Sequence, residues 1–271
     1  MTRRTFHAAA LGAASGWLAR AAETTQSQAE QHGRQLLQQA LTAMGGEAFL
    51  GMRDRTEVGR AYSFYREQLT GLAVAHFYIR YVPAPPEALG VEERQTFGKK
   101  QDNSILFAHG QGFDVTFRGA RPLPDERVQR YQESTQLDIL YVLHHRLHES
   151  GLQAVAGGAE VVENQRVESV EIADRENRAV TVYFSTTSHL PVMQRRFRRD
   201  PLFKDRIEEI TRYSTYVDVG GGVKWPKQIT RERDGEMIYQ MFAETVKINT
   251  GLAENLFTLP NGIPMLKKPA I

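Results

Sequence analysis

Three histidines within five residues are the side chains whose types and spacing most suggest chemistry: His144, His145 and His148. On an α-helix His144 and His148 lie one turn apart on the same face, as paired zinc ligands do. Zinc hydrolases with this spacing also carry a glutamate directly after the first histidine, whereas position 145 is a second histidine. We therefore favour a polar helix face with neutral imidazoles and no metal. A metal-dependent periplasmic hydrolase that uses the three histidines is the alternative.

The densest run of charge in the chain lies in a segment with strand character. Its arginines are Arg195, Arg196, Arg198 and Arg199. On a strand, alternate members face opposite sides. Guanidinium groups bind phosphate through paired hydrogen bonds, so the run is a hypothetical contact for lipid headgroups. The interpretation that we favour is a solvated edge strand whose charges prevent sheet-to-sheet association, with Glu208 and Glu209 as ion-pair partners.

Apolar side chains recur at every second position in several segments, which is typical of strands with one dry face. If the dry faces surround an open space, they form a groove for a lipid or acyl chain. If they do not, the same residues are ordinary core. The hypothetical groove residues are Phe77, Ile79, Tyr81, Val180, Val182, Phe184, Ile238 and Phe242. A softer stripe of Met237, Tyr239 and Met241 occupies the other face of the last segment, and either face can be the inner one.

No other pattern in the sequence indicates catalysis. The G-x-S-x-G elbow, the P-loop and the dinucleotide fingerprint are missing from the sequence. The 271 residues include no cysteine, which excludes disulfides, thiolate metal sites and a cysteine nucleophile. We therefore expect a non-enzymatic protein that needs no cofactor.

Residues 1–21 have the pattern of an export signal of the twin-arginine type. Arg3 and Arg4 precede Phe6, and a mildly apolar run ends at Ala19-Arg20-Ala21, which is a cleavage pattern. The run is shorter than the ~20 apolar residues that a spanning helix needs. Removal of the signal lowers the basic residues from 34 to 31, against 32 acidic ones. We expect a soluble periplasmic product that binds no nucleic acid.

Residues 22–271 are predicted to form a single domain. An amphipathic helix from about Ser27 to Met44 ends at Gly45-Gly46, because glycine adopts the left-handed cap conformation at little cost. A second helical segment spans residues 122–150. The rest is predicted as short strands, with a central meander over residues 166–198 that turns at residues 174–177. A polar linker over residues 23–31 and a poorly ordered proline-containing tail complete the chain.

Two helical segments among many sequential strands predict an α+β fold. Twist accumulates across a long antiparallel sheet and makes it curl. We therefore predict a curled antiparallel sheet, a half-open β-barrel, that wraps over two or three helices. Such an architecture leaves an apolar groove between sheet and helices.

Turn and strand-end signals between residues 36 and 260 carry a family resemblance. They are Ala40-Leu41-Thr42-Ala43-Met44-Gly45-Gly46, Tyr183-Phe184-Ser185 with Leu190-Pro191, Val223-Lys224-Trp225-Pro226, Arg233-Asp234-Gly235-Glu236, and Val246-Lys247-Ile248-Asn249 with Leu256-Phe257. In these segments the chain resembles the LolA-like superfamily of outer-membrane lipoprotein-sorting proteins, and most of all its uncharacterised periplasmic branch. The resemblance implies a carrier of lipids or acylated proteins across the periplasm.

Together these patterns predict a lipid- or lipoprotein-binding carrier. Each buried CH₂ contributes ~0.8 kcal/mol, so an acyl chain needs an apolar shelter in order to cross water. Its partners are expected to be a lipid or an acylated protein, and a membrane complex of the cell envelope. Besides the hydrolase, the alternative is an envelope scaffolding protein whose interior is closed by its own side chains.

Overall fold

One antiparallel sheet organises the chain. The computed structural model describes residues 12–85, 88–200 and 203–268, and thirteen strands pair side by side within them. The strands are β1 (Asp54–Tyr65), β2 (Gln68–Tyr81), β3 (Val91–Phe97), β4 (Asn103–Ala108), β5 (Gln111–Thr116), β6 (Gly119–Pro122), β7 (Gln153–Val162), β8 (Gln165–Ala173), β9 (Ala179–Ser185), β10 (Pro191–Arg199), β11 (Arg206–Asp218), β12 (Lys224–Arg233) and β13 (Glu236–Ile248). The helices are α1 (Gly12–Met44), α2 (Glu47–Leu50), α3 (Asp125–Gln136), α4 (Ile139–Tyr141), a π-helix (Val142–Arg146) and a 3₁₀ turn (Glu254–Leu256).

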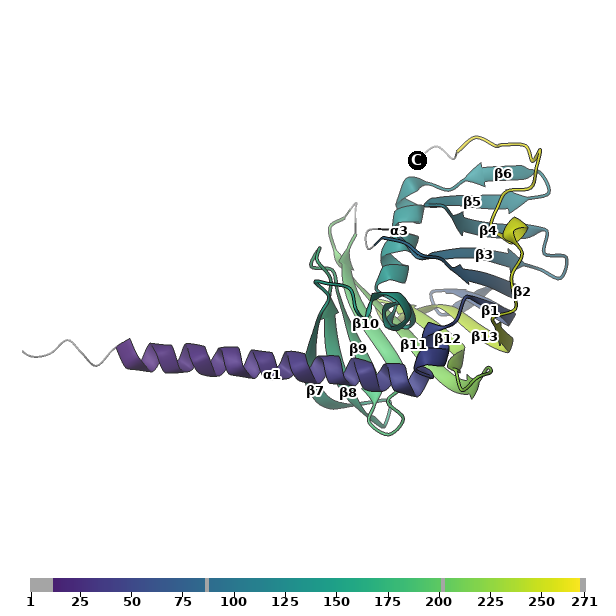
Figure 1. Ribbon diagram of the computed structural model, residues 1–271. Helices are drawn as coiled ribbons and strands as arrows, with labels where there is room; N and C mark the ends of the chain where they lie inside the picture. Colours follow the sequence, from purple (N-terminus) through teal and green to yellow (C-terminus); the bar gives the residue numbers. More distant parts are fainter. Residues whose placement is uncertain (1–11, 86–87, 201–202, 269–271) are drawn as a thin grey trace, which may run out of the picture.

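Each strand pairs with its neighbour in the chain, with one exception. β6 and β7 form the two edges of the sheet, and the pairing of β13 with β1 joins its halves. The segment with α3, α4 and the π-helix connects β6 to β7, and it therefore crosses the sheet from edge to edge (Figure 1). We call the face that carries these helices, α1 and α2 the helix-side face, and the opposite one the outer face.

The α+β class and the antiparallel pairing are confirmed. The predicted curl into a half-open barrel is wrong. The sheet is neither closed nor strongly curled. Both edges are occupied by other parts of the chain, which leaves nothing to drive them together. Ala120 of β6 exchanges two backbone hydrogen bonds with the tail, at Pro264 and Leu266. At the opposite edge α1 packs against β7.

The predicted meander is confirmed as β8, β9 and β10, because alternation and turn residues are local signals. The turn at residues 174–177 closes with a hydrogen bond of 2.9 Å from the Asn177 amide to the Asp174 carbonyl. The sequence interpretation missed β7, whose centre is Gly157-Gly158. Glycine weakens strand propensity, and the register of β7 with β8 shifts at this pair.

Helix α1 confirms the predicted end at Met44 but is longer than predicted. Gly46 donates to the Leu41 carbonyl at 2.9 Å, which closes the expected glycine cap. Toward the N-terminus the helix continues to Gly12, so the linker predicted for residues 23–31 is wrong. Residues 1–11, with the twin-arginine pair, lie outside the described residues.

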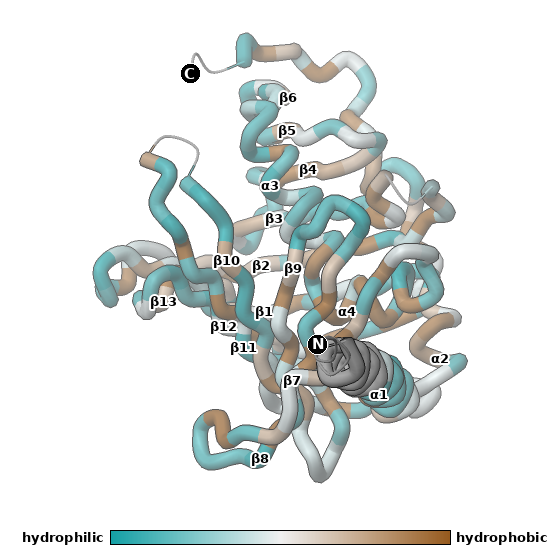
Figure 2. The backbone as a smooth tube through the Cα atoms, turned by 90° about the vertical axis from the view of Figure 1, so that its left-hand side faces the viewer, coloured by the Kyte–Doolittle hydropathy of each residue, from teal (hydrophilic) through white to brown (hydrophobic). Residues whose placement is uncertain are grey.

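The main core lies between α1, α2, the π-helix and the strands from β7 to β12. Gly33 allows the close approach of α1, since a Cβ atom at this position would lie 2.6 Å from the Ala154 carbonyl oxygen of β7. Figure 2, viewed along α1, places the helix beside β7. The largest buried side chains of this core include Leu37, Met44, Phe49, Ile139, Val142, Leu143, Ile172, Phe184 and Trp225.

The C-terminal tail is ordered against the outer face, contrary to the prediction. Arg94 of β3 donates to the carbonyl oxygens of Leu256 and Thr258, the latter at 2.9 Å. Leu259 and Ile263 pack on a small apolar cluster formed by β4, β5 and β6. Proline therefore excludes regular structure in the tail without preventing it from packing.

No helix in the described ranges has the length and apolar character to cross a membrane.

Candidate functional site

The π-helix brings His144 and His145 together. It widens the helical turn, so two neighbouring residues point into the same interior region. Their Nδ1 atoms lie 2.7 Å apart, and His144 Nε2 lies 3.2 Å from the Met52 carbonyl oxygen. The His144 ring stacks on Tyr81 at 4.1 Å between centroids, and the His145 ring stacks on Tyr141 at 4.7 Å. The two imidazoles are thus held by aromatic rings on both sides.

Both imidazoles are neutral at neutral pH. Burial, followed by the neighbouring His145, lowers the pKa of His144 to about 3. Burial likewise lowers the pKa of His145, against the hydrogen bonds that it makes to the backbone at Gly90 and Val82. Tyr141 also receives a hydrogen bond of 2.8 Å from the Gly90 amide. The pair therefore fastens the segment before β3 to the π-helix.

Arg55 continues this cluster toward the sheet. Its guanidinium lies over the Trp225 ring at 3.8 Å and donates to Glu57 at 2.7 Å and to the Tyr81 hydroxyl. Burial opposes the charge of Arg55, but the nearby Tyr81 and Glu57 outweigh burial and raise the pKa. The cluster is a satisfied polar network and presents no nucleophile with an adjacent base.

The structure separates His148 from the other two histidines. Its side chain is exposed, whereas His144 and His145 are half-buried. The expectation that His144 and His148 share a helix face is therefore wrong, because the turn between them is a π-turn. Among the described residues no three histidine or carboxylate groups are placed to hold a metal ion.

A second apolar region, the central cluster, lies at the middle of the helix-side face. Its members are Ala61, Ala75, Phe77, Ile79, Val91, Tyr141, Met241 and Ala243, with Tyr81, Leu89, Phe97, Tyr239 and Val246 at its margin. All except Tyr141 and Leu89 belong to strands of the sheet. We call the strand residues of this cluster the central wall. The buried ones are only 0–9% exposed, and Tyr141 and Leu89 are the members that other elements contribute.

An exposed cation lies beside the central cluster. Arg231 of β12 pairs in register with Tyr239 of β13, and its guanidinium lies 5.5 Å from the centroid of that ring. Within the described residues it makes no hydrogen bond and no ion pair. Arginine binds carboxylate and phosphate groups well, so Arg231 is placed to meet an anionic group at the edge of the wall.

The predicted groove residues divide into three groups. Phe77 and Ile79 belong to the central cluster, and Tyr81 lies at its margin. The three groove residues of β9, Val180, Val182 and Phe184, are packed in the main core under α1. Ile238 and Phe242 point to the outer face, and Phe242 is 42% exposed there. The soft stripe of the last strand is the inner one, and only the pairing of β13 with β1 decides this.

The arginine run lies on β10, which pairs with β11 as far as Arg199 but with β9 only as far as Arg195. The interpretation as an edge strand therefore holds from Arg196 to Arg199 and is wrong for Arg195. Arg196 and Arg198 both bind Glu209 of β11, the latter at 2.7 Å. This ion pairing is the one that the sequence suggested. Arg195 lies over Tyr183 and Phe197 on the outer face, and Arg199 is exposed. The four guanidinium groups therefore do not converge on one point.

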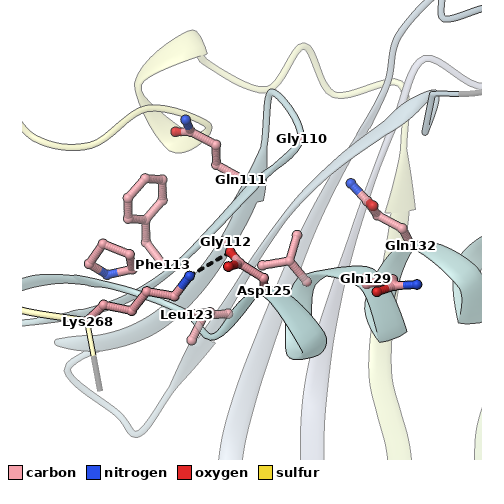
Figure 3. Close-up of a pocket in the computed structure, with 11 residues that line it drawn as sticks. Gly110, Gln111, Gly112, Phe113, Leu123, Asp125, Gln129, Gln132 and Lys268 are labelled. Atoms are coloured by element: carbon pink, nitrogen blue, oxygen red, sulfur yellow. Dashed lines mark ion pairs between the residues drawn. The ribbon is translucent and has the colours of Figure 1, made fainter. Parts of the chain in front are cut away.

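Two surface cavities lie along α3, away from all the predicted site residues. The outer cavity, of about 380 Å³, lies between α3 and the β4–β5 turn, and Figure 3 shows Lys268 and Asp125 paired at its mouth. The deep cavity, of about 270 Å³, lies between α3 and the β8–β9 turn. Sequence reasoning missed both, although the spacing of glutamines on α3 was a readable signal.

Arg146 is the central group of the deep cavity. It is 5% exposed, donates to Glu149 at 2.6 Å and to the Gln136 carbonyl at 2.7 Å, and lies 3.7 Å from Asp174. Burial raises the pKa of Asp174, but the hydrogen bonds from Arg178 outweigh burial, so the pKa is lowered. The charges of Arg146, Glu149 and Asp174 are therefore held in place by hydrogen bonds.

The fold defines a structural class: an α+β protein with one large antiparallel sheet and helices on one face. No protein-family model matches the sequence, and no curated protein matches it in sequence. The comparison with solved structures, in contrast, gives clear matches.

One match is a Vibrio parahaemolyticus domain named for outer membrane lipoprotein sorting, with a TM-score of 0.57 at 10% identity, over 84% of this chain and 97% of that one. Another is a DUF1329 family protein from Desulfovibrio piger, with a TM-score of 0.57 at 10% identity, over 85% and 97%. These likenesses show that the chain has the lipoprotein-sorting type of fold, which confirms the predicted resemblance at the level of fold.

Proposed function

We propose that this protein is an exported, periplasmic binding protein of the carrier type, which holds the apolar chain of a lipid or an acylated protein. The observation that carries the proposal is the central wall. Ala61 of β1, Ala75 of β2 and Ala243 of β13 lie among the larger rings of Phe77, Phe97 and Tyr239, so the wall is apolar across four adjacent strands. A flexible chain laid along this wall replaces contacts with water by contacts with carbon, at ~0.8 kcal/mol for each CH₂.

The polar end of such a ligand has a partner in Arg231. This arginine is accessible to solvent beside Tyr239 and makes no ion pair within the described part of the chain. Burial opposes its charge, but the nearby Tyr239 and Asp138 outweigh burial and raise the pKa of Arg231. It replaces the run from Arg195 to Arg199 as the proposed headgroup contact, since Arg196 and Arg198 already bind Glu209. The likeness in fold to a lipoprotein-sorting domain supports the same class of ligand.

Met241 and Tyr239 give the wall its adaptability. Met241 is buried on the helix-side face, and a methionine side chain changes shape at low energetic cost. The outer cavity along α3 shares no residue with this wall, and the deep cavity shares only Leu89 with its margin. Binding therefore requires that side chains over the wall, Tyr141 and Leu89 first, move to admit a chain.

The test is direct. Protein purified from the cell envelope should retain lipid that is detected by native mass spectrometry and by extraction, and a fluorescent fatty acid should bind to the delipidated protein. An absence of bound lipid together with no fatty-acid binding would refute the proposal.

A second candidate is an envelope interaction protein with a closed interior. The packed main core favours it, since α1 and the π-helix fill the space over β7 to β9 with their own side chains. If the purified protein carries no lipid but enriches one membrane complex in a pulldown, this second function replaces the first.

A further inference from the structure

The two cavities along α3 form one groove. Asp125, Gln129, Gln132 and Gln136 all line them, at spacings of four, three and four residues, which is one face of a helix. Gln129 and Gln132 line both cavities, so the cavities adjoin at these two side chains and we treat them as one groove. Along this face α3 rises by about 16 Å between Asp125 and Gln136, at ~1.5 Å per residue. We call this feature the α3 groove.

Two amides in the α3 groove have no partner. Gln136 is 6% exposed, lines the deep cavity and makes no side-chain hydrogen bond to any described residue. The half-buried side chain of Gln132 makes none either within the same ranges. The polar atoms of both amides remain in contact with solvent. A ligand can therefore replace water on them, and each such hydrogen bond contributes about 0.5–1.5 kcal/mol. Each amide offers two donors and one acceptor.

The ends of the α3 groove differ in chemistry. The outer cavity has an apolar floor that includes Phe113, Leu123 and Val128. Charged side chains dominate the deep cavity: Arg146, Arg175 and Arg178, against Glu133, Glu149, Asp174 and Glu176. Among these carboxylates Glu133 accepts a hydrogen bond only from the neutral Gln129, at 2.9 Å. Glu133 is therefore the free anion of the deep cavity.

We propose that the α3 groove binds an extended peptide with an apolar side chain in the outer cavity and a basic side chain beside Glu133. Gln132 and Gln136 lie about 6 Å apart along the helix axis. An extended chain presents backbone amides to one side at a similar repeat, about 6.6 Å for two residues. The deep cavity holds no aromatic ring on which a sugar could stack, which favours a peptide over a glycan. This site meets the central cluster only at Leu89, and the proposal does not depend on the function proposed above.

The experiment titrates the full chain with fluorescent peptide amides of alanine that carry one phenylalanine and, three residues later, one lysine. Matched peptides replace the lysine by glutamate or the phenylalanine by serine. The variants are Gln136→Leu, which removes the buried amide at similar volume, and Glu133→Gln. Gln35→Leu, an exposed glutamine of α1, is the control. Thermal melts establish that each variant is folded.

The expected result is binding that weakens about tenfold in Gln136→Leu, as the loss of a buried hydrogen-bond pair implies, and stays unchanged in Gln35→Leu. Glu133→Gln should abolish the preference for lysine over glutamate. The proposal is overturned if no peptide binds more tightly than about 1 mM, if Gln136→Leu binds as the parent does, or if oligosaccharides bind in place of peptides.

Discussion

His144 and His145 are consecutive in the chain, and their Nδ1 atoms lie 2.7 Å apart. A regular α-helix separates consecutive side chains by about 100°, so this contact depends on the π-helix at Val142–Arg146. One imidazole donates to the other only if at least one of the two is neutral. The packing of the segment near Gly90 therefore depends on the protonation state of His144 and His145.

Acid should destabilise the protein through His144. Its pKa is about 3 in the folded state against an ordinary value of 6.5, so between these values the unfolded chain binds a proton that the folded chain does not. The contribution of His144 to the free energy of unfolding is fully present above pH 6.5. It is lost as the pH falls toward 3, by up to about 1.4 kcal/mol per pH unit. Thermal melts of His144→Phe should therefore fall less between pH 7 and pH 4.5 than those of the parent. His148→Gln, at an exposed position, should follow the parent; equal acid sensitivity in all three proteins would contradict the assignment.

Gly33→Ala should destabilise the protein although alanine favours helices. In an isolated helix this change stabilises by about 1 kcal/mol. Here the new Cβ atom would lie 2.6 Å from the Ala154 carbonyl oxygen, so α1 must move away from β7. We expect a net loss of about 1–3 kcal/mol in denaturant unfolding. Gln35→Ala, on the exposed side of α1, should be neutral or slightly stabilising, and a gain in stability for Gly33→Ala would show that α1 is not docked in this way.

Arg146→Met should be far more damaging than Arg130→Met. Arg146 is buried and bound to Glu149 and to a backbone carbonyl, so its removal leaves the buried carboxylate of Glu149 without a cation, at about 3–5 kcal/mol, whereas Asp174 keeps Arg178. Arg130 forms an exposed pair with Glu126 one turn away on α3, and such pairs contribute about 0.3–0.5 kcal/mol. Urea midpoints of the two variants measure the difference. Similar midpoints would mean that the Arg146 network is not formed in solution.

Ending the chain at Asn255 should uncover the outer face of β4 to β6. The tail buries Phe257 completely and covers Leu106 and Val115 through Leu259 and Ile263. The truncated protein should bind a dye that reports exposed apolar surface and should melt at a lower temperature. Ending the chain at Lys268 is the control and should leave both measurements unchanged. If the truncated protein keeps the melting temperature of the parent, the tail does not contribute to stability.

Ala73→Phe should block an apolar ligand. Ala73 pairs with Ala61 on the helix-side face, beside the central cluster, and is only half-buried, so a ring can fill the wall without destroying the fold. Fatty-acid affinity should fall at least tenfold, about 1.4 kcal/mol. Val74→Phe places the same ring on the outer face of β2 and should bind as the parent does. If Ala73→Phe binds the fatty acid with the affinity of the parent, the ligand does not lie on this wall.

Arg231→Gln should weaken the binding of an anionic headgroup without weakening the binding of the apolar chain. We expect weaker binding of a fatty acid but unchanged binding of its uncharged methyl ester, because only the acid offers a carboxylate to Arg231. Arg60→Gln, which removes an exposed arginine of the outer face, is the matched control. If the variant binds both ligands more weakly, or binds both as the parent does, Arg231 does not contact the headgroup.

By itself the sequence determined the local features: the cap at Gly45-Gly46, the meander from β8 to β10, the antiparallel α+β class and the resemblance in fold. These follow from interactions between residues close in the chain, which alternation and turn chemistry report directly. The tertiary structure alone decided which face of β13 looks inward, because a strand with apolar residues on both sides is consistent with either choice until β1 pairs with it. It also decided the course of the sheet, whose edges are occupied by α1 and the tail, and it assembled the α3 groove from Gln136, Arg146 and Asp174. Contacts between residues far apart in the chain depend on packing and on buried charge, and neither can be read from the order of residues in the sequence.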